Sequence, residues 1–450
     1  MNKDVAEMSQ VYQVEATEQG VPAGYKQTEV GVIPEDWEVA RFGELYEDFI
    51  SRKNLKSTDN ATFVGMQDVS ESAQLVSQHE LLNAEVKSGF TYFERGDVLV
   101  AKITPCFENG KGCHTENLET EVGFGSTEFH VLRAKKSASS KFIYFWTIRE
   151  SFRNALELEM VGSAGHRRVP YAALQNYLIP CPESKKEQTA IANALSDVDA
   201  LLNELEKLIA KKQAIKTATM QQLLTGRTRL PQFAQHQDGS PKGYKQSELG
   251  EIPEDWEAKS FGDMFESSIT RKSLKLNEIV SFVGMQDVSE SAHLENQLQT
   301  QYSNVKSGFT YFEKGDVLVA KITPCFENGK GCHTNNLKTT VGFGSTEFHV
   351  LRAKSSSDAE FIYFWTTRES FRVGLESEMV GSAGHRRVPL SSLQNYLIPC
   401  PADKSEQTAI ATILSDMDAD IQALEHRLNK THQIKQGMMQ ELLTGRTRLL

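Results

Sequence analysis

The sequence is poor in the features that mark secreted or membrane-embedded proteins. Only six of its 450 residues are cysteines, three in each half of the chain, which favours reduced thiols in a large cytoplasmic protein. No apolar run is long enough to span a bilayer, and residues 1–24 are too polar for a signal peptide. We therefore expect a cytoplasmic protein. Cys106, Cys113 and His114 could form half of a metal site, but their spacing matches no common zinc pattern.

The common catalytic motifs are also missing. The sequence has no Gly-x4-Gly-Lys-Ser/Thr phosphate loop and no Gly-x-Gly-x-x-Gly after a strand. It lacks the Asn-Pro-Pro-aromatic run that adenine methyltransferases usually carry, and it has neither a Gly-x-Ser-x-Gly elbow nor a His-Glu-x-x-His helix. We therefore expect no catalytic centre and no metal or cofactor bound by this chain.

The net charge of −11 argues mildly against a stand-alone nucleic-acid binder, because such proteins usually carry a basic excess or a basic face. The distribution of charge matters more than its total. An acidic average leaves room for local basic loops and for a basic partner subunit.

What the sequence does contain is a direct repeat. The motif GDVLVAKITPCFENGKGCHT at 96–115 returns unchanged at 315–334, and MVGSAGHRRVP at 160–170 returns at 379–389, each 219 residues further on. This period is far longer than the roughly 20 to 50 residues of solenoid repeats. The chain is therefore a duplicated unit of one domain and one helix.

Each unit ends in a long helix. Ser184-Lys-Lys-Glu187 is typical of a capping box, and Gly226 is a plausible C′ residue, so we expect a helix over 187–224 and its copy over 406–443. Such a helix is roughly 57 Å long at about 1.5 Å per residue. Apolar residues spaced by fours and threes favour a coiled-coil seam, with the copy as partner, over two unrelated helices packing on their own domains. The stripe residues are Ile191, Leu195, Val198, Leu202, Leu205, Ile209, Ile410, Leu414, Met417, Ile421, Leu424 and Leu428.

Within the first domain we expect a turn at 31–37, strands at 62–66, 96–103 and 123–133, and a helix over 142–158. The boundaries that we predict are a flexible tail at 1–23, domains at 24–182 and 243–401, spacer helices within 183–230 and 402–450, and a linker at 231–242.

Basic and amide-bearing loops are the positive signal for function. In the loop 162–168, two glycines allow close backbone approach, and Arg167 and Arg168 can bind phosphate, or guanine O6 and N7. The alternative is an ion-paired surface loop. In the turn 108–114, Asn109, Lys111 and His114 offer base- and phosphate-binding groups, although a plain hairpin turn is equally compatible.

The segment 51–53 is a weaker candidate, and Arg149 and Arg153 could follow a phosphate backbone or pair with neighbouring glutamates. The candidate DNA-binding residues are Arg52, Lys53, Lys102, Asn109, Lys111, His114, Gly165, His166, Arg167 and Arg168, with their copies Arg271, Lys272, Lys321, Asn328, Lys330, His333, Gly384, His385, Arg386 and Arg387.

The order GDVLVAKITPCFENGK, GFGSTEFHVLR, GSAGHRRVP, LIPCP and EQTAIA, all repeated, resembles the specificity subunit of Type I restriction-modification enzymes. The resemblance implies two target recognition domains, each binding one half of a split site in double-stranded DNA. It also implies two docked methyltransferase subunits that flip out adenines for N6 methylation, and restriction subunits that translocate and cleave. These partners would use S-adenosylmethionine, ATP and Mg. The near identity of the two domains departs from the family, whose members usually carry two different ones.

The topology follows from the repeat itself. The ends of a domain tend to lie close together, so the second helix should begin beside the end of the first, and the two should run antiparallel. We expect an α+β fold class: two similar α/β target recognition domains separated by a pair of long antiparallel coiled-coil helices, with pseudo-twofold symmetry. Twofold symmetry implies inverted DNA half-sites about one helical turn apart.

Two other interpretations remain open. The chain could be the specificity subunit of a Type IIB-like or orphan methyltransferase, which has the same architecture with different partners. It could also be a protein-interaction scaffold that never binds DNA. Steep salt dependence of DNA binding would distinguish a DNA-binding subunit from a scaffold.

Overall fold

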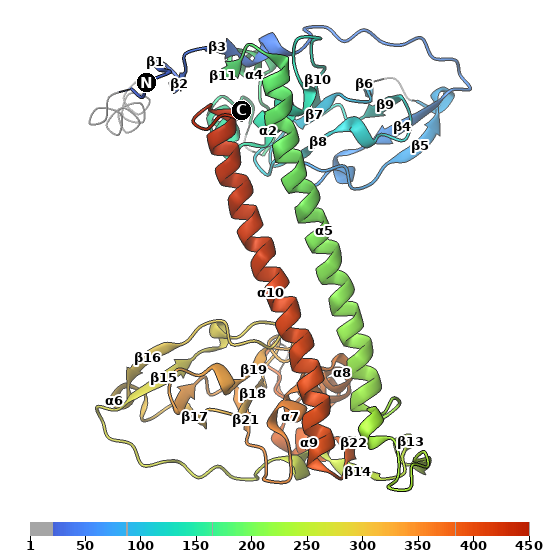
Figure 1. Ribbon diagram of the computed structural model, residues 1–450, viewed down its shortest axis with the longest axis vertical. Helices are drawn as coiled ribbons and strands as arrows, with labels where there is room; N and C mark the ends of the chain where they lie inside the picture. Colours follow the sequence, from blue (N-terminus) through green and yellow to red (C-terminus); the bar gives the residue numbers. More distant parts are fainter. Residues whose placement is uncertain (1–20, 87–88, 164, 383, 450) are drawn as a thin grey trace. The chain divides into compact units, whose positions relative to one another are not determined.

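The computed structural model describes residues 21–86, 89–163, 165–382 and 384–449. Most of the tail predicted at 1–23 lies outside these residues. The chain divides into two compact units, Met1–Glu206 with Arg427–Leu450, and Lys207–His426. Each unit contains one globular domain and a part of both long helices (Figure 1).

The first domain begins and ends on the same small sheet. Strand β1 (Tyr25–Thr28) forms a hairpin with β2 (Gly31–Pro34), and β3 (Trp37–Arg41) pairs antiparallel with the last strand, β11 (Leu178–Pro182). The turn predicted at 31–37 is confirmed only for residues 35–36, because residues 31–34 form β2 and Trp37 begins β3. A further turn, at residues 29–30, joins β1 to β2, and Gly31 directly after it adopts a positive φ of 107° that L-residues with side chains disfavour.

Two further sheets form the body of this domain. One has the order β5 (His79–Leu82), β4 (Asn60–Val64), β9 (Val122–Gly125) and β6 (Thr91–Glu94), and the other the order β10 (Phe129–Leu132), β7 (Val98–Ala101) and β8 (Gly112–His114). The single strand predicted at 123–133 is two strands in different sheets. A turn separates them, in which the Ser126 hydroxyl accepts from the Glu128 amide at 3.2 Å and the Ser126 carbonyl accepts from the Phe129 amide at 3.2 Å.

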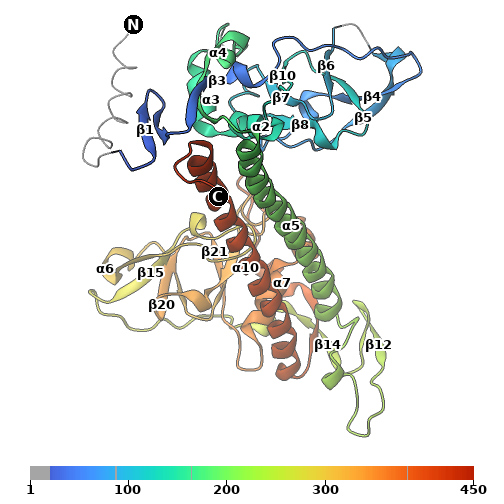
Figure 2. The same cartoon turned by 45° about the horizontal axis from the view of Figure 1, so that its top comes forward.

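Short helices cover the three-stranded sheet. Helix α2 (Ser140–Ile148) lies on β7 and β8 and is followed by α3 (Glu150–Leu158) and α4 (Tyr171–Asn176) (Figure 2). The single helix predicted over 142–158 is thus two helices, because Arg149 between them has an extended backbone, with φ −69° and ψ 126°. Phe142, Trp146 and Phe152 are buried in the main core, and burying such a side chain stabilises a fold by roughly 1.5–3 kcal/mol.

The second domain repeats this order, with one added short helix, α6, after β16. Its sheets are β12–β13, β14–β22, β16-β15-β20-β17 and β19-β18-β21. Its elements are β12 (Tyr244–Ser247), β13 (Gly250–Pro253), β14 (Trp256–Ser260), β15 (Ile279–Val283), β16 (Leu298–Gln301), α6 (Tyr302–Val305), β17 (Thr310–Glu313), β18 (Val317–Ala320), β19 (Gly331–His333), β20 (Val341–Gly344), β21 (Phe348–Leu351), α7 (Ala359–Thr367), α8 (Glu369–Glu376), α9 (Leu390–Asn395) and β22 (Leu397–Pro401).

The two long helices are α5 (Lys185–Leu224) and α10 (Lys404–Leu443). In the first unit Lys435 pairs with Asp199 at 2.5 Å. In the second unit, Lys212 pairs with Asp420 at 3.0 Å and Lys216 pairs with Asp418. Within this unit, the residue numbers rise along one helix as they fall along the other. The antiparallel helix pair is confirmed, and the fold class is α+β with two similar domains.

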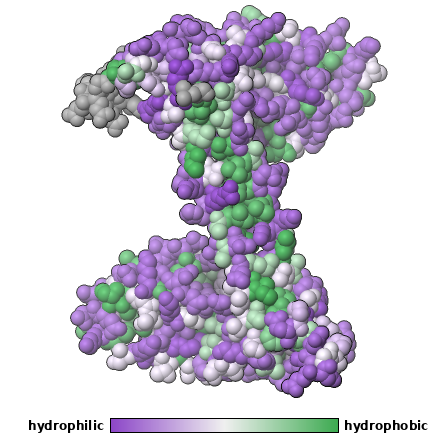
Figure 3. All heavy atoms as spheres, viewed as in Figure 1, coloured by the Kyte–Doolittle hydropathy of each residue, from purple (hydrophilic) through white to green (hydrophobic). Residues whose placement is uncertain are grey.

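The predicted stripe faces the interior. Of its members, Val198, Met417, Leu424 and Leu428 are half-buried, and the others are buried. Side chains outside the stripe, such as Leu208 and Ile215, stay exposed, and Figure 3 shows apolar surface along the helices. No helix among the described residues is both long enough and apolar enough to cross a membrane.

The helix starts differ from the predicted capping boxes. The Ser184 hydroxyl accepts a hydrogen bond from the Lys186 amide at 3.2 Å, as expected of an N-cap. The carboxylate of Glu187, however, accepts from Arg448 at the far end of the repeat. A charged donor forms a stronger bond with a carboxylate than an amide does, so this tertiary contact replaces the local one.

Candidate nucleic-acid interface

The basic hairpin, which we define as residues 161–168, is hydrogen-bonded to the residues that directly follow β7. Val161 and Arg168 exchange two backbone hydrogen bonds of 3.0 and 2.8 Å, and the Thr104 amide donates to the Arg167 carbonyl at 2.9 Å. Gly162 and Gly165 both have a positive φ, of 132° and 81°, which glycine adopts without strain. Ala164 lies outside the described residues. The copy at 380–387 has the same backbone bonds, again 3.0 and 2.8 Å.

Both arginines of the basic hairpin face carboxylates. Arg168 donates to the two oxygens of Glu128 at 2.9 and 2.7 Å, and these bonds hold the pKa of Glu128 below its usual value. Arg167 lies 3.6 Å from Glu108 and 3.7 Å from Glu157. Both guanidinium groups remain partly accessible to solvent, with side-chain exposures of 38% for Arg167 and 44% for Arg168.

The second domain repeats these pairs. Arg387 donates to Glu347 at 2.9 and 2.8 Å, and Arg386 lies 3.8 Å from Glu327. Lys102, at the base of the hairpin, accepts a backbone hydrogen bond from Val169 at 2.8 Å, as Lys321 does from Val388. The structure therefore brings together Lys102, Gly165, His166, Arg167 and Arg168 in one place, and their copies in the other.

The polar side chains of the turn 108–114 form hydrogen bonds to other parts of the same domain. The Asn109 amide donates to Glu71 at 2.8 Å, and the Lys111 ammonium donates to the Met66 carbonyl at 3.1 Å. His114 is bonded to Ser140 at 2.9 Å, and burial lowers its pKa to about 4. These contacts favour the alternative interpretation of a hairpin turn with structural bonds, and a direct DNA contact of these residues stays a prediction.

Two of these three contacts recur in the second domain, and the third has a different partner. Asn328 donates to Glu290 at 2.8 Å and Lys330 to the Met285 carbonyl at 3.2 Å, whereas His333 is bonded to the Gly315 carbonyl at 3.3 Å. Arg149 and Arg153 do not share one helix as predicted, because Arg149 precedes α3 with an extended backbone. The Arg149 guanidinium lies over the Trp146 ring, 5.0 Å from its centroid. The Arg153 guanidinium lies against Gly110, so closely that a side-chain Cβ at this position would be only 1.8 Å from it.

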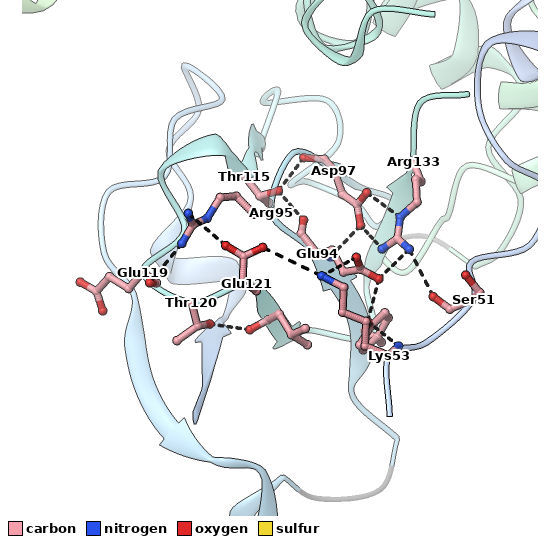
Figure 4. A network of polar contacts seen from close by, with 12 residues as sticks. Ser51, Lys53, Glu94, Arg95, Asp97, Thr115, Glu119, Thr120, Glu121 and Arg133 are labelled. Atoms are coloured by element: carbon pink, nitrogen blue, oxygen red, sulfur yellow. Dashed lines mark hydrogen bonds and ion pairs between the residues drawn. The ribbon is translucent and has the colours of Figure 1, made fainter. Parts of the chain in front are cut away.

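A network of ion pairs holds the segment 51–53 against β6 and β10 (Figure 4). Arg133 donates to Asp97 at 2.9 and 2.7 Å, to Glu94 at 2.7 Å and to the Ser51 carbonyl at 3.2 Å. These carboxylates raise the pKa of Arg133 above its ordinary value. The Arg133 guanidinium thus stays charged and fixes the backbone of the segment.

Lys53 belongs to the same network. Its amide donates to the Tyr92 hydroxyl at 2.9 Å and its ammonium lies 3.2 Å from Glu94. Arg52 lies over the Tyr92 ring, 5.6 Å from its centroid, as Arg271 lies 5.7 Å from that of Tyr311. In the second domain Lys272 pairs with Glu313. Arg52 and Arg271 therefore occupy equivalent positions, each beside an aromatic ring of its own domain.

The sequence did not reveal a groove beside this segment, with a volume of about 430 Å³. His130 of β10 connects it to the basic hairpin, because its ring nitrogen Nε2 donates to the Val169 carbonyl at 2.9 Å. The groove is lined by Asp48, Phe49, Ile50, Arg52, Gly89, Phe90, Thr91, Tyr92, Phe129, His130, Val131 and Tyr171. A usable signal was the aromatic Phe49 shortly before two basic residues, a combination that suits nucleic-acid binding.

Each of the two α+β domains carries a basic hairpin with the same backbone bonds, and the residues that line the groove of the first domain largely recur in the second. This duplication defines the class of the protein as a modular one with two copies of the same domain. The family model of the Type I restriction modification DNA specificity domain matches this chain twice, over residues 34–217 and 253–436. The chain therefore belongs to that family, as its resemblance to Type I specificity subunits implied.

Individual relatives agree with this assignment. The chain is 24% identical over 440 residues to the putative Type I restriction enzyme MjaX specificity subunit of Methanocaldococcus jannaschii. This match covers 94% of this chain and 97% of the relative. It is 36% identical over 166 residues to the EcoEI specificity subunit of Escherichia coli, a match that covers 36% of this chain and only 28% of that relative. A solved S subunit of a Type I system from M. genitalium has the same fold, with a TM-score of 0.53, 15% identity and coverage of 94% and 98%.

Proposed function

We propose that this chain is the non-catalytic DNA-recognition subunit of a Type I restriction-modification complex. It binds a bipartite double-stranded DNA site and positions two adenine-N6 methyltransferase subunits and the restriction subunits on it. The chain itself binds no cofactor, while its partners use S-adenosylmethionine, ATP and Mg. The complex works in the cytoplasm, where its DNA substrate is found.

The observation that carries this proposal is the duplication of the basic hairpin with its geometry intact. Arg167 and Arg168 are presented on the same turn, with the same backbone bonds, as Arg386 and Arg387. Arginine forks match phosphate oxygens or the O6 and N7 atoms of guanine. A site made of two similar half-sites requires two such surfaces on one chain.

Because the two hairpins are identical in sequence, the site that we propose is an interrupted palindrome, or differs from one at few positions. Twofold-related loops recognise the same bases on opposite strands. Sequencing of methylated adenines in DNA from the host tests this directly. Two unrelated half-sites would contradict it.

DNA binding by the complex with its methyltransferase subunits should fall steeply with salt, because each neutralised phosphate contributes about −0.9 to the slope of log K against log salt concentration. A chain that binds no DNA, or binds it without a salt slope, would instead be a protein-interaction scaffold. A methyltransferase complex that never recruits a restriction subunit would identify the Type IIB-like or orphan form.

A further inference from the structure

The residues that line the groove of the first domain differ from their equivalents in the second domain at only three positions. Nine of the twelve residues that line the groove of the first domain recur in the copy, among them Arg52, Tyr92 and His130 as Arg271, Tyr311 and His349. The exceptions are Asp48, Phe49 and Tyr171, which are replaced by Ser267, Ser268 and Leu390. The duplication thus isolates a local difference within two otherwise matching surfaces.

Phe49 is not needed for folding. Its side chain is 92% exposed, so it gains almost none of the free energy that burial of an apolar side chain provides. The same backbone forms in the second domain with an exposed serine, Ser268, in its place. An aromatic side chain that the fold leaves in water is available for a ligand.

The backbone that follows Phe49 is held by hydrogen bonds. The Ser51 carbonyl and the Lys53 amide are both bonded, to Arg133 at 3.2 Å and to the Tyr92 hydroxyl at 2.9 Å (Figure 4). The segment that carries Phe49 is therefore anchored directly after it. The backbone next to Phe49 therefore loses little conformational entropy when a ligand binds.

Tyr171 is a second aromatic group in the lining of the groove. Its ring lies 5.4 Å from that of His130 and 6.1 Å from that of Tyr46, measured between centroids. Val169, two residues earlier, is bonded to His130 and follows Arg168 of the basic hairpin. The groove thus offers aromatic faces beside arginines, a combination that fits a nucleotide with an apolar or planar group next to a phosphate.

We propose that Phe49 and Tyr171 form an apolar DNA contact that the second domain lacks, so that the two half-sites differ at the base pair facing this groove. The contacted group is a thymine methyl or the face of a base, since both are apolar and lie within reach of a wedge-like side chain. This inference rests on the proposed function. It makes Phe49 and Tyr171 specificity determinants in a protein whose two basic hairpins are identical in sequence.

The decisive experiment exchanges the grooves in the full chain bound to its methyltransferase subunits. Asp48→Ser with Phe49→Ser and Tyr171→Leu gives the first domain the lining of the second, and Ser267→Asp with Ser268→Phe and Leu390→Tyr does the reverse. Preferred sites are then selected from DNA with two randomised half-sites. We expect two half-sites that differ at the groove position for the natural chain, and identical half-sites for each variant.

A matched control exchanges the other large block of differences. Residues 76–85, which include β5, differ from their copy at 295–304 at all but one position, and residues 76–85 do not line the groove. This variant should keep the natural half-sites. Half-sites that follow the β5 block and not the groove would overturn the inference, as would identical half-sites in the natural chain. Absence of any sequence-specific binding by the natural chain would instead overturn the proposed function.

Two substitutions in the DNA identify the contacted group. If it is a thymine methyl, uracil at that position should weaken binding of the natural chain by roughly fourfold, the factor for one buried methyl-sized group, and should leave Phe49→Ser unaffected. If it is a base face, 2-aminopurine there should brighten on binding of the natural chain but not of Phe49→Ser. If the natural chain and Phe49→Ser behave alike in both tests, the proposed contact is overturned.

Discussion

Arg448, just beyond the end of helix α10, donates two hydrogen bonds of 2.9 Å to the carboxylate of Glu187 in the first turn of helix α5. Arg229, just beyond the end of α5, makes the same pair with Glu406 at the start of α10, at 2.7 and 2.9 Å. Each unit thus joins the end of one helix to the start of the other. The pairs differ in burial: the Arg229 and Glu406 side chains are 6% and 4% exposed, those of Arg448 and Glu187 36% and 15%.

This difference predicts unequal effects of the same substitution. Arg229→Ala should destabilise the second unit by roughly 3–5 kcal/mol, because it leaves the buried Glu406 carboxylate without its cation. Arg448→Ala should cost the first unit about 1 kcal/mol or less, because water can solvate Glu187. Urea unfolding of the two variants measures both free energies. Equal losses would show that burial does not determine the strength of these pairs.

Arg167→Ala combined with Arg386→Ala should weaken specific DNA binding by about 1–3 kcal/mol for each lost bidentate base contact. If these arginines contact only phosphates, binding should weaken evenly across sequences, with a salt slope smaller by about 1 for each. Arg95→Ala is a matched control, since Arg95 is 41% exposed against 38% for Arg167 and pairs with Glu121 away from the hairpin. Unchanged affinity at every salt concentration would make the hairpins purely structural.

Buried histidines should make the protein less stable in mild acid. Burial lowers the pKa of His114 to about 4, below the value of about 6.5 for an unfolded histidine. Between these two values the unfolded chain binds more protons, so the contribution is full above pH 6.5 and falls towards pH 4, by about 1.4 kcal/mol per pH unit. In His114→Gln, the unfolding free energy should decline less steeply between pH 6.5 and 5. An identical slope in both proteins would contradict the assignment.

If the length of the helices sets the distance between the two half-sites, inserting one heptad after Leu205 and another after Leu424 should widen the preferred gap. The insertion keeps both stripes in phase and adds roughly 10 Å of helix at about 1.5 Å per residue, or about three base pairs at about 3.4 Å each. Selection from a library of gap lengths measures this. A four-residue insertion is the control, because it disturbs the stripe and should impair folding or docking. An unaltered gap in the folded heptad variant would show that the helices serve only as a docking surface.

Local patterns in the sequence determined the parts of the structure that depend on near neighbours. The period of 219 residues established the duplication, and the stripe from Ile191 to Ile209 established the long helix and its buried face, because helical spacing repeats within a few residues. Gly226 ends α5 with a φ of 71°, as its position after the last apolar residues predicted. The family followed from the order of the repeated motifs.

Local patterns were misleading where the chain changes direction within an apolar run. The sequence pattern of residues 142–158 predicts a helix throughout, but the extended backbone at Arg149 separates α2 from α3. Residues 123–133 alternate like one strand but contribute to two sheets. In both cases the competing packing surfaces, and not local propensity, decide where the element stops.

Only the tertiary structure decided how the candidate site is assembled. The groove combines residues near positions 50, 90, 130 and 171, and Lys111 is bonded to the Met66 carbonyl, 45 residues away. Glu187 pairs with Arg448 across 261 residues instead of capping its own helix. Such contacts depend on which strands and helices pair, and pairing is set by long-range burial and charge that no short stretch of sequence contains.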